Sequence, residues 1–313
     1  MQPNPKDYDF ELDHALGAVV GVRSIIPEDA FTAQILGTER AGNGVLIRSD
    51  GVVLTIGYLI AEAETVWLNL SDGQVVGGHV LAYDHVTGFG LVQALARLDL
   101  PALPLGESET VRIGENAVIG GAGGRSESVA ARVVAKQEFA GYWEYVLDEA
   151  IFTAPSHPNW GGAPLIGPNG KLLGIGSLQL QRSLGDRQVE DINMIVPIDL
   201  LKPVLDDLMT VGRPRGTPRP WLGLYATEVN GQIVVAALAS HGPAAEADLD
   251  AGDIVLGIGG EQAHDLADFF RTIWSLGDAG IDVPLTIHRE GKTFDVWVKS
   301  GDRNDYLKSP VLH

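Results

Sequence analysis

Short runs in which apolar and polar residues alternate fill the first two hundred residues of the chain. Residues 42–60 and 65–84 each contain two such runs, separated by a Ser-Asp-Gly turn. Further runs lie between residues 116 and 180, where Asn169-Gly170 provides a turn that accepts positive φ. Short strands at this spacing are typical of an all-β barrel or sandwich. The two sets therefore predict two barrels packed together.

The hydrophobic period changes after these strands. Leu200, Leu201, Val204, Leu205 and Leu208 recur at helical spacing. Residues 212–220, "GRPRGTPRP", combine prolines and glycines with charged and polar residues, which is typical of a linker.

A new unit begins at Trp221 with strands, two helical patches and a closing hairpin. The first helix is expected after Gly242, because Pro243 suits an opening turn. The second is expected over residues 265–276, "DLADFFRTIWSL", with Leu266, Phe269, Phe270 and Ile273 on one side. The tail beyond residue 303 has no usable pattern.

Charge and composition narrow the classes of function. The 313 residues are 45% apolar, and 22 basic residues face 41 acidic ones, for a formal net charge of −19. Nucleic acids and anionic membranes attract basic patches, so we expect neither as a partner. The chain has no cysteine, which excludes disulfides and Cys-based zinc sites. Its histidines show no metal-binding spacing, so no metal or other cofactor is expected.

The amino terminus carries acidic residues where a signal peptide has basic ones, and its apolar stretch, residues 16–22, is short. No apolar run reaches the roughly 18–20 residues that a membrane span needs. The sequence therefore predicts a cytoplasmic protein without a membrane span.

Several linked motifs resemble the HtrA-like family of trypsin-fold serine proteases with a C-terminal PDZ domain. They are "GNGVLIRSDGVVLT", "LNLSDGQVVGGHVLAYD", "GGAPLIGPNGKLLGIGS" and "AAEADLDAGDIVLGIGGEQAHDLADF", in the family's order. The resemblance implies a mainly β fold, a chymotrypsin-like double β-barrel followed by an α+β PDZ domain. The expected parts are an N-terminal segment (1–16), the degenerate protease domain (17–211), the linker (212–220), the PDZ domain (221–302) and a tail (303–313).

All three catalytic positions that the resemblance implies are substituted. A serine peptidase needs a hydroxyl nucleophile, an imidazole base and a carboxylate that orients the base. Tyr58 stands at the position of the histidine, Gly88 at that of the aspartate and Gly161 at that of the serine. A tyrosine, with a pKa of about 10, is protonated at neutral pH and is a poor base.

Neighbouring residues offer alternatives. Ser156 and His157 could form a displaced catalytic pair, although adjacent side chains on an extended chain diverge, which favours an ordinary polar loop. His85, beside Asp84, and His157 could instead hold a metal, although a surface turn is the simpler interpretation of the Asp84-His85 doublet. Trp160 either packs against a neighbouring loop or plugs the substrate groove.

The peptide-binding residues of a PDZ domain are largely present. The family resemblance implies a carboxylate-binding loop at "WLGL", formed by Trp221, Leu222, Gly223 and Leu224. The other wall of the groove would be the second helix, with Leu266, Phe269, Phe270 and Ile273. The alternative is that Leu222 and Leu224 are plain core residues of a strand; Gly223 favours the loop, because it allows the backbone to approach a ligand closely.

These observations predict a catalytically inactive protease homologue that binds peptide or protein C-termini through its PDZ domain, as a scaffold, adaptor or chaperone-like binder. The family resemblance also allows a homo-oligomer. The alternatives are a divergent serine endopeptidase with a displaced nucleophile, and a barrel reused for a metal or small ligand.

Overall fold

The computed structural model describes residues 2–185 and 188–308 and separates into two compact units. The first unit contains the chain up to Gln137 and Glu149–Arg215, and the second contains Glu138–Asp148 and Gly216–Lys308. Residues 309–313 of the predicted tail lie outside the described residues.

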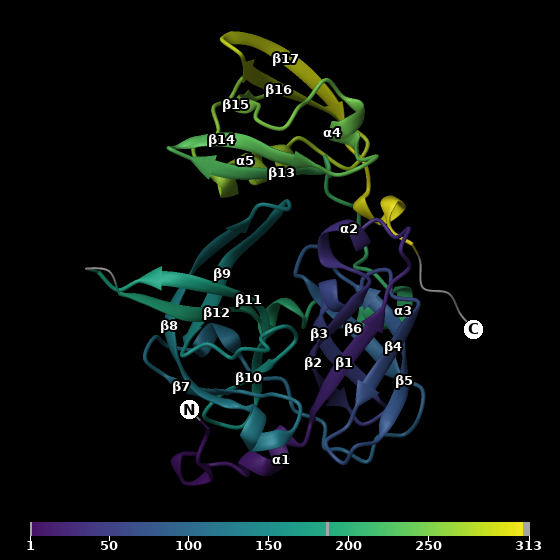
Figure 1. The fold of residues 1–313 in the computed structure, drawn as a ribbon, viewed down its shortest axis with the longest axis vertical. Coiled ribbons are helices and arrows are strands. Elements are labelled where there is room, and N and C mark those ends of the chain that lie inside the picture. Colours follow the sequence, from purple (N-terminus) through teal and green to yellow (C-terminus); the bar gives the residue numbers. More distant parts are fainter. Residues whose placement is uncertain (1, 186–187, 309–313) are drawn as a thin grey trace. The chain divides into compact units, whose positions relative to one another are not determined.

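The first unit begins with a closed six-stranded barrel in the order β1-β2-β3-β6-β5-β4 (Figure 1). Its strands are β1 (Val19–Ile25), β2 (Glu39–Arg48), β3 (Val52–Ile56), β4 (Thr65–Asn69), β5 (Val75–Tyr83) and β6 (Phe89–Ala94). The shorter elements are η1 (Pro5–Asp7), α1 (Leu12–Leu16), α2 (Ala33–Leu36) and η2 (Gly57–Leu59). Leu46, Leu54 and Phe89 are completely buried, so the apolar positions of the alternating runs fill the barrel.

The same unit holds a second closed barrel, in the order β10-β11-β12-β9-β8-β7. Its strands are β7 (Asn116–Ile119), β8 (Val129–Gly141), β9 (Tyr145–Ala154), β10 (Pro164–Ile166), β11 (Leu172–Ser183) and β12 (Val189–Pro197). Around them lie η3 (Ser108–Thr110), η4 (Gly124–Glu127), η5 (Ile198–Leu200) and α3 (Leu205–Val211). The prediction of two barrels is confirmed.

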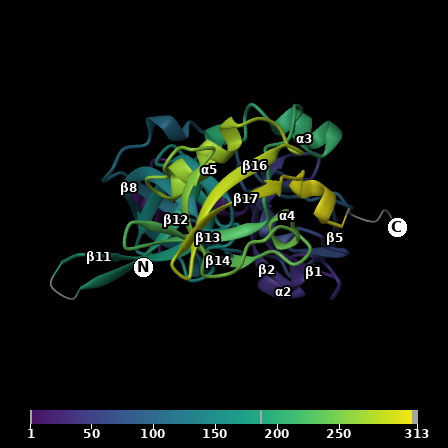
Figure 2. The same ribbon diagram turned by 90° about the horizontal axis from the view of Figure 1, so that it is seen from above.

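The second unit is built on a five-stranded antiparallel sheet in the order β13-β14-β15-β16-β17, shown from another direction in Figure 2. Its elements are β13 (Leu224–Val229), β14 (Gln232–Leu238), α4 (Pro243–Glu246), β15 (Ile254–Ile258), α5 (Leu266–Ser275), β16 (Asp282–Arg289), β17 (Lys292–Lys299) and η6 (Arg303–Tyr306). Asp265 caps α5 by accepting a hydrogen bond from the Asp268 amide. Both helices begin where the sequence predicts them.

The structure departs from the sequence-based expectations at three places. Residues 200–208 do not form one helix, because η5 ends at Leu200 and α3 begins only at Leu205. The tail, which has no usable sequence pattern, forms η6, and its Tyr306 ring lies 4.8 Å from that of Trp221. The end of the β8–β9 hairpin, Glu138–Asp148, belongs to the second unit rather than to the barrel that supplies its strands.

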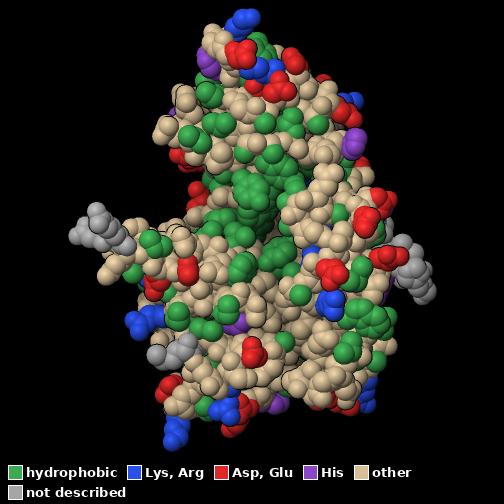
Figure 3. Space-filling model, viewed as in Figure 1, with side chains coloured by type: hydrophobic (Ala, Val, Ile, Leu, Met, Phe, Trp, Pro, Cys, Tyr) green, Lys and Arg blue, Asp and Glu red, His purple; other side chains and the backbone are tan. Residues whose placement is uncertain are grey.

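Acidic side chains are spread over the face shown in Figure 3, with basic side chains scattered among them. No helix in the described part of the chain has the length and hydropathy needed to cross a membrane.

Candidate functional site

The structure brings Tyr58 and Gly161 into direct contact inside the first unit. A Cβ atom added to Gly161 would lie only 2.7 Å from the Tyr58 hydroxyl oxygen, closer than such atoms approach one another. That hydroxyl donates a hydrogen bond to the Ser177 carbonyl at 3.0 Å. The tyrosine hydroxyl therefore occupies space that a side chain at position 161 would need.

Burial controls the chemistry of the Tyr58 phenol. Desolvation raises the pKa of Tyr58 well above the ordinary value of 10, and a hydrogen bond from the Trp160 side chain opposes this only in part. The phenol is therefore protonated at any physiological pH, and its proton is already donated to Ser177. It cannot serve as a general base there.

Gly88 lies beside the turn that carries Tyr58, because its carbonyl accepts a 2.7 Å hydrogen bond from the Gly57 amide. Its φ is +86°, a conformation that glycine adopts at little cost. The buried Asp84 shapes this loop by accepting hydrogen bonds from the Val86 amide and the Thr87 hydroxyl. Asp84 thus has a structural role in the Asp84-His85 doublet, and the loop presents no carboxylate at position 88.

Two buried charged residues, Arg40 and Glu62, were not singled out in the sequence; they lie beside the turn η2 and are linked through the Thr32 hydroxyl. Arg40 donates to the Tyr58 carbonyl at 2.7 Å and to the Ala61 carbonyl at 3.1 Å. Glu62, at φ +61°, accepts hydrogen bonds from the amide and hydroxyl of Thr32, and that hydroxyl also accepts one from Arg40. The backbone of Tyr58 is therefore fixed by side chains that are themselves paired.

Asn43 of β2 joins the two barrels around Gly161. Its side-chain nitrogen donates to the Asn159 carbonyl at 2.7 Å, and its side-chain oxygen, Oδ1, accepts from the Ala122 amide at 2.9 Å. Its backbone amide donates to the Gly161 carbonyl at 2.8 Å. Gly162, at φ +74°, allows this approach, since a Cβ atom there would lie 1.8 Å from the backbone carbonyl oxygen of Asn43. The loop around position 161 is thus firmly built.

His157 is buried and uses both of its ring nitrogens. Nδ1 accepts a hydrogen bond from the Asn159 amide at 3.0 Å, so the ring proton is on Nε2, which lies 2.6 Å from the Glu127 carbonyl. No lone pair is left for the hydroxyl of Ser156, which counts against a displaced catalytic pair. In a trypsin-like site the amide two residues before the nucleophile stabilises the oxyanion. Here that amide belongs to Asn159 and is bonded to His157.

Trp160 is half-buried, and its side chain lies beside Tyr58, where it lowers the pKa of the phenol. This contact joins Trp160 to the neighbouring η2 turn, so packing against a neighbouring loop and plugging the substrate groove both stay open as interpretations.

The predicted carboxylate-binding loop forms a concave set of amides in the second unit. The carbonyls of Leu222 and Gly223 accept hydrogen bonds, both 2.7 Å long, from the Ala244 and Ala239 amides. Gly223, at φ +72°, turns the chain so that the amides of Leu222, Gly223 and Leu224 all point towards one common position. Convergent backbone amides of this kind bind anions.

That set of amides already holds an anion from the same chain. The carboxylate of Glu144, in the β8–β9 turn, accepts from Gly223 at 2.7 Å, from Leu222 at 3.1 Å and from Leu224 at 3.2 Å. Its burial raises the pKa of Glu144 from 4.5 to about 7, while the three amides and the charge of Arg303 lower it. Nothing in the sequence pattern singles out Glu144.

The predicted groove helix contributes mainly to the core. Phe269, Phe270 and Ile273 are fully buried, in one apolar cluster with Leu222, Leu224 and Val146 of β9. Leu266 packs against this cluster from a partly buried position, and Trp221 is 7% exposed. The predicted peptide-binding residues therefore come together, with part of the hairpin included among them.

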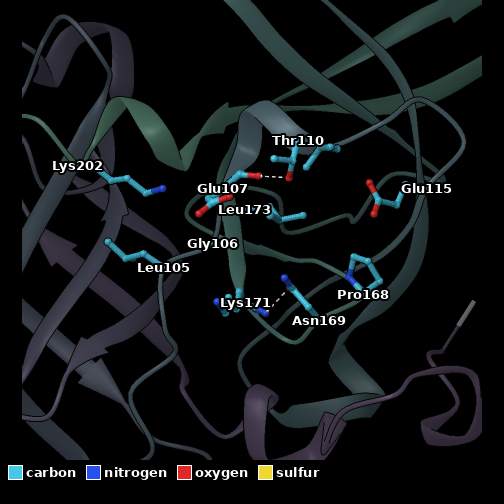
Figure 4. Close-up of a pocket in the computed structure, with 11 residues that line it drawn as sticks. Leu105, Gly106, Glu107, Thr110, Glu115, Pro168, Asn169, Lys171, Leu173 and Lys202 are labelled. Carbon is cyan, nitrogen blue, oxygen red and sulfur yellow. Dashed lines mark hydrogen bonds between the residues drawn. The ribbon is translucent and has the colours of Figure 1, made fainter.

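Two other features of the chain bear on possible sites. A polar pocket of about 190 Å³ in the first unit is lined by Glu107, Glu115, Lys171 and Lys202, and it contains none of the predicted site residues (Figure 4). In the described part of the chain, no group of three or more His, Asp or Glu residues is placed to hold a metal ion.

The comparisons with known proteins cover both units. The profile of the trypsin-like peptidase domain matches residues 42–175, and that of the PDZ domain matches residues 220–299. A probable periplasmic serine endoprotease, DegP-like, of Pseudomonas putida is 31% identical over 282 residues, 84% of this chain and 56% of the relative. The serine endoprotease DegS of Salmonella typhimurium is 24% identical over 94% of this chain and 86% of its own.

The chain belongs to the HtrA family. Its domain order, a trypsin-like double barrel followed by a PDZ domain, is that of this family. Solved structures show the same fold. The HtrA-type protease AlgW with a tripeptide matches with a TM-score of 0.53 at 20% identity, covering 96% of this chain and 97% of AlgW. The serine endoprotease from Yersinia pestis matches with a TM-score of 0.54 at 21% identity, covering 94% and 98%.

The family assignment corrects one expectation from the sequence. A cytoplasmic location is wrong, because the DegP-like relatives from Pseudomonas and Halomonas are named periplasmic endoproteases. This HtrA-family chain spans little more than half the length of those relatives, 56–57%.

A serine introduced at position 161 should destabilise the protein. Gly161→Ser places its Cβ against the Tyr58 hydroxyl, and overpacking of this kind costs about 1–3 kcal/mol of unfolding free energy. Removing that oxygen in the double variant Tyr58→Phe/Gly161→Ser should recover most of the loss, as measured by urea denaturation. Equal losses in the single and double variants would show that the hydroxyl is not the obstacle.

Asn43→Ala should lower the unfolding free energy of the barrels by about 2–4 kcal/mol, because it leaves the Asn159 carbonyl and the Ala122 amide without their partner. Asn116→Ala, at an exposed position of β7, is the matched control and should change the free energy by less than about 0.5 kcal/mol. The same denaturation measurement compares the two variants, and similar losses would contradict the role given to Asn43.

The stability of the second unit should depend on pH through Glu144. Between pH 4.5 and about 7 the folded protein binds more protons at Glu144 than the unfolded chain does, so its stability falls as the pH rises through that window. Arg303 on η6 and Tyr225 on β13 are the other ionisable groups that interact with this carboxyl. Glu144→Gln should flatten the slope in thermal melts, and an unchanged slope would contradict the raised pKa.

Proposed function

We propose that this HtrA-family protein does not hydrolyse peptide bonds and that it acts as a peptide-binding scaffold, adaptor or chaperone-like protein, in protein quality control. The observation that carries the proposal is the contact between Tyr58 and Gly161, where a protonated hydroxyl fills the place of a nucleophile. Its relatives named endoproteases share the domains, but the activity depends on the residues at this site.

Each part of the hydrolytic mechanism lacks its group at the expected position. Gly161 offers no nucleophile, Tyr58 no lone pair of useful basicity and Gly88 no carboxylate to orient a base. Loss of the nucleophile or the base alone costs on the order of 10⁶ in turnover in a serine protease. The turnover that remains would fall below most assays.

The PDZ domain supports the binding part of the proposal. Its three convergent amides suit a carboxylate, and β13 offers backbone groups to an added peptide strand. We therefore propose proteins or peptides with a free C-terminal carboxylate as partners. A homo-oligomer stays a prediction from the family resemblance.

The proposal is tested with the purified full chain and a fluorophosphonate probe, alongside cleavage of unfolded casein. We expect no labelled serine and no cleavage, while an active HtrA protease is labelled and cuts under the same conditions. Stoichiometric labelling of one serine, or cleavage abolished by Ser156→Ala, would overturn the proposal and establish a displaced nucleophile.

A further inference from the structure

We propose that the tip of the β8–β9 hairpin, residues 138–148, is an internal ligand of the PDZ domain, which an external C-terminal peptide must displace in order to bind. The hairpin tip and the PDZ domain form one compact unit. This inference rests on the proposed peptide-binding function and adds a mechanism that regulates it.

The Glu144 carboxylate stands where a peptide C-terminus would bind. It accepts hydrogen bonds from three consecutive amides of the carboxylate-binding loop, at Leu222, Gly223 and Leu224. Glu144 is only 7% exposed, so water contributes little to its solvation. A carboxylate without water is stable only if such donors surround it, and an empty loop would in turn leave three amides to be solvated.

The hairpin tip also reproduces the strand pairing and the apolar anchor of a bound peptide. The Tyr142 carbonyl accepts a 2.9 Å hydrogen bond from the Ala226 amide of β13, the pairing expected of an added strand. The Tyr142 and Tyr225 rings lie 5.9 Å apart. Val146 is buried with Phe269, Phe270 and Ile273 of α5, where a terminal apolar side chain would pack.

The two ends of the tip are tied to the groove helix. Arg271 of α5 pairs with Glu138 and with Asp148, each at 2.5 Å, so one guanidinium bridges both strands of the hairpin. These pairs are solvent-exposed, and such pairs contribute little to stability. The buried contacts of Glu144 and Val146 must therefore supply most of the docking free energy.

The backbone conformation of Glu144 supports a specific docking role for its carboxylate. Its φ is +58°, in the left-handed region where a non-glycine residue is strained. Glycine would adopt this turn at lower cost. The strain persists in the docked arrangement, in which the carboxylate makes its three hydrogen bonds.

The internal ligand also indicates which external ligand can replace it. A competing segment needs a free carboxylate for the three amides, a backbone carbonyl for Ala226 and a medium-sized apolar last residue in place of Val146. A peptide that ends in valine and has a free carboxylate meets all three requirements, whereas its C-terminal amide fails the first.

The first experiment measures docking without any peptide. Amide hydrogen exchange of the full chain should show protection of Leu222, Gly223 and Leu224, and Glu144→Gly should reduce that protection at least about tenfold. Glu290→Gly is the matched control, because Glu290 is an exposed glutamate with φ +49° in the β16–β17 turn. It should leave the exchange of these three amides unchanged.

The second experiment measures competition. A fluorescent decapeptide ending in Val-COOH should bind Glu144→Gly at least about tenfold more tightly than the wild type. In the wild type the docked tip lowers the fraction of molecules whose groove is free to bind peptide. Glu144→Gln keeps the shape but replaces one of the two acceptor oxygens with an amide donor, so it should show a smaller gain in the same direction. The amidated peptide should bind all variants weakly.

The outcomes separate this proposal from the proposed function. Unprotected amides in the wild type, or equal peptide affinity in wild type and Glu144→Gly with both proteins folded, would overturn the internal ligand. Protected amides together with no peptide binding by any variant would support the internal ligand and overturn the peptide-binding function. Glu144→Gly carries no strain at position 144, so its far-UV spectrum and melting profile distinguish undocking from unfolding.

Discussion

The need of every buried polar group for a partner is the constraint on which both sites of this molecule depend. In the PDZ domain the three amides of residues 222–224 face one carboxylate, that of Glu144, and each satisfies the other. In the barrels the side chain of Asn43 provides the hydrogen-bond partner of the Asn159 carbonyl and of the Ala122 amide. The loops around both sites thereby keep a defined shape.

Tyr58 and Gly161 are packed against each other. Gly161 has no side chain, and the Tyr58 hydroxyl approaches it and bonds to the Ser177 carbonyl. Arg40 and Glu62 hold the turn that carries Tyr58, and His157 uses both ring nitrogens to support the neighbouring loop. Interiors tolerate few voids, so these polar groups serve packing and loop structure.

The two sites differ in chemistry. The barrel unit has a tyrosine at position 58 and glycines at positions 88 and 161, while the PDZ domain presents three backbone amides to a carboxylate. On our proposals, the protein binds C-terminal peptides without cleaving them, and the docked hairpin tip lowers the affinity of the PDZ domain for these peptides. An internal competitor raises the apparent dissociation constant in inverse proportion to the fraction of time for which the groove is free.

The alternation of apolar residues and the turn residues between them determined both barrels, and the spacing in residues 265–276 determined α5, because these patterns depend on near neighbours in the chain. The family resemblance also singled out Tyr58, Gly88 and Gly161 from the sequence, as predicted catalytic positions. The break between η5 and α3 was not, since apolar spacing alone does not locate a helix start. Only the tertiary structure decided that Glu144 meets Gly223, 79 residues away, and that Asn43 meets Asn159, 116 residues away. Such contacts form through folding over long distances in sequence, and no local periodicity records them.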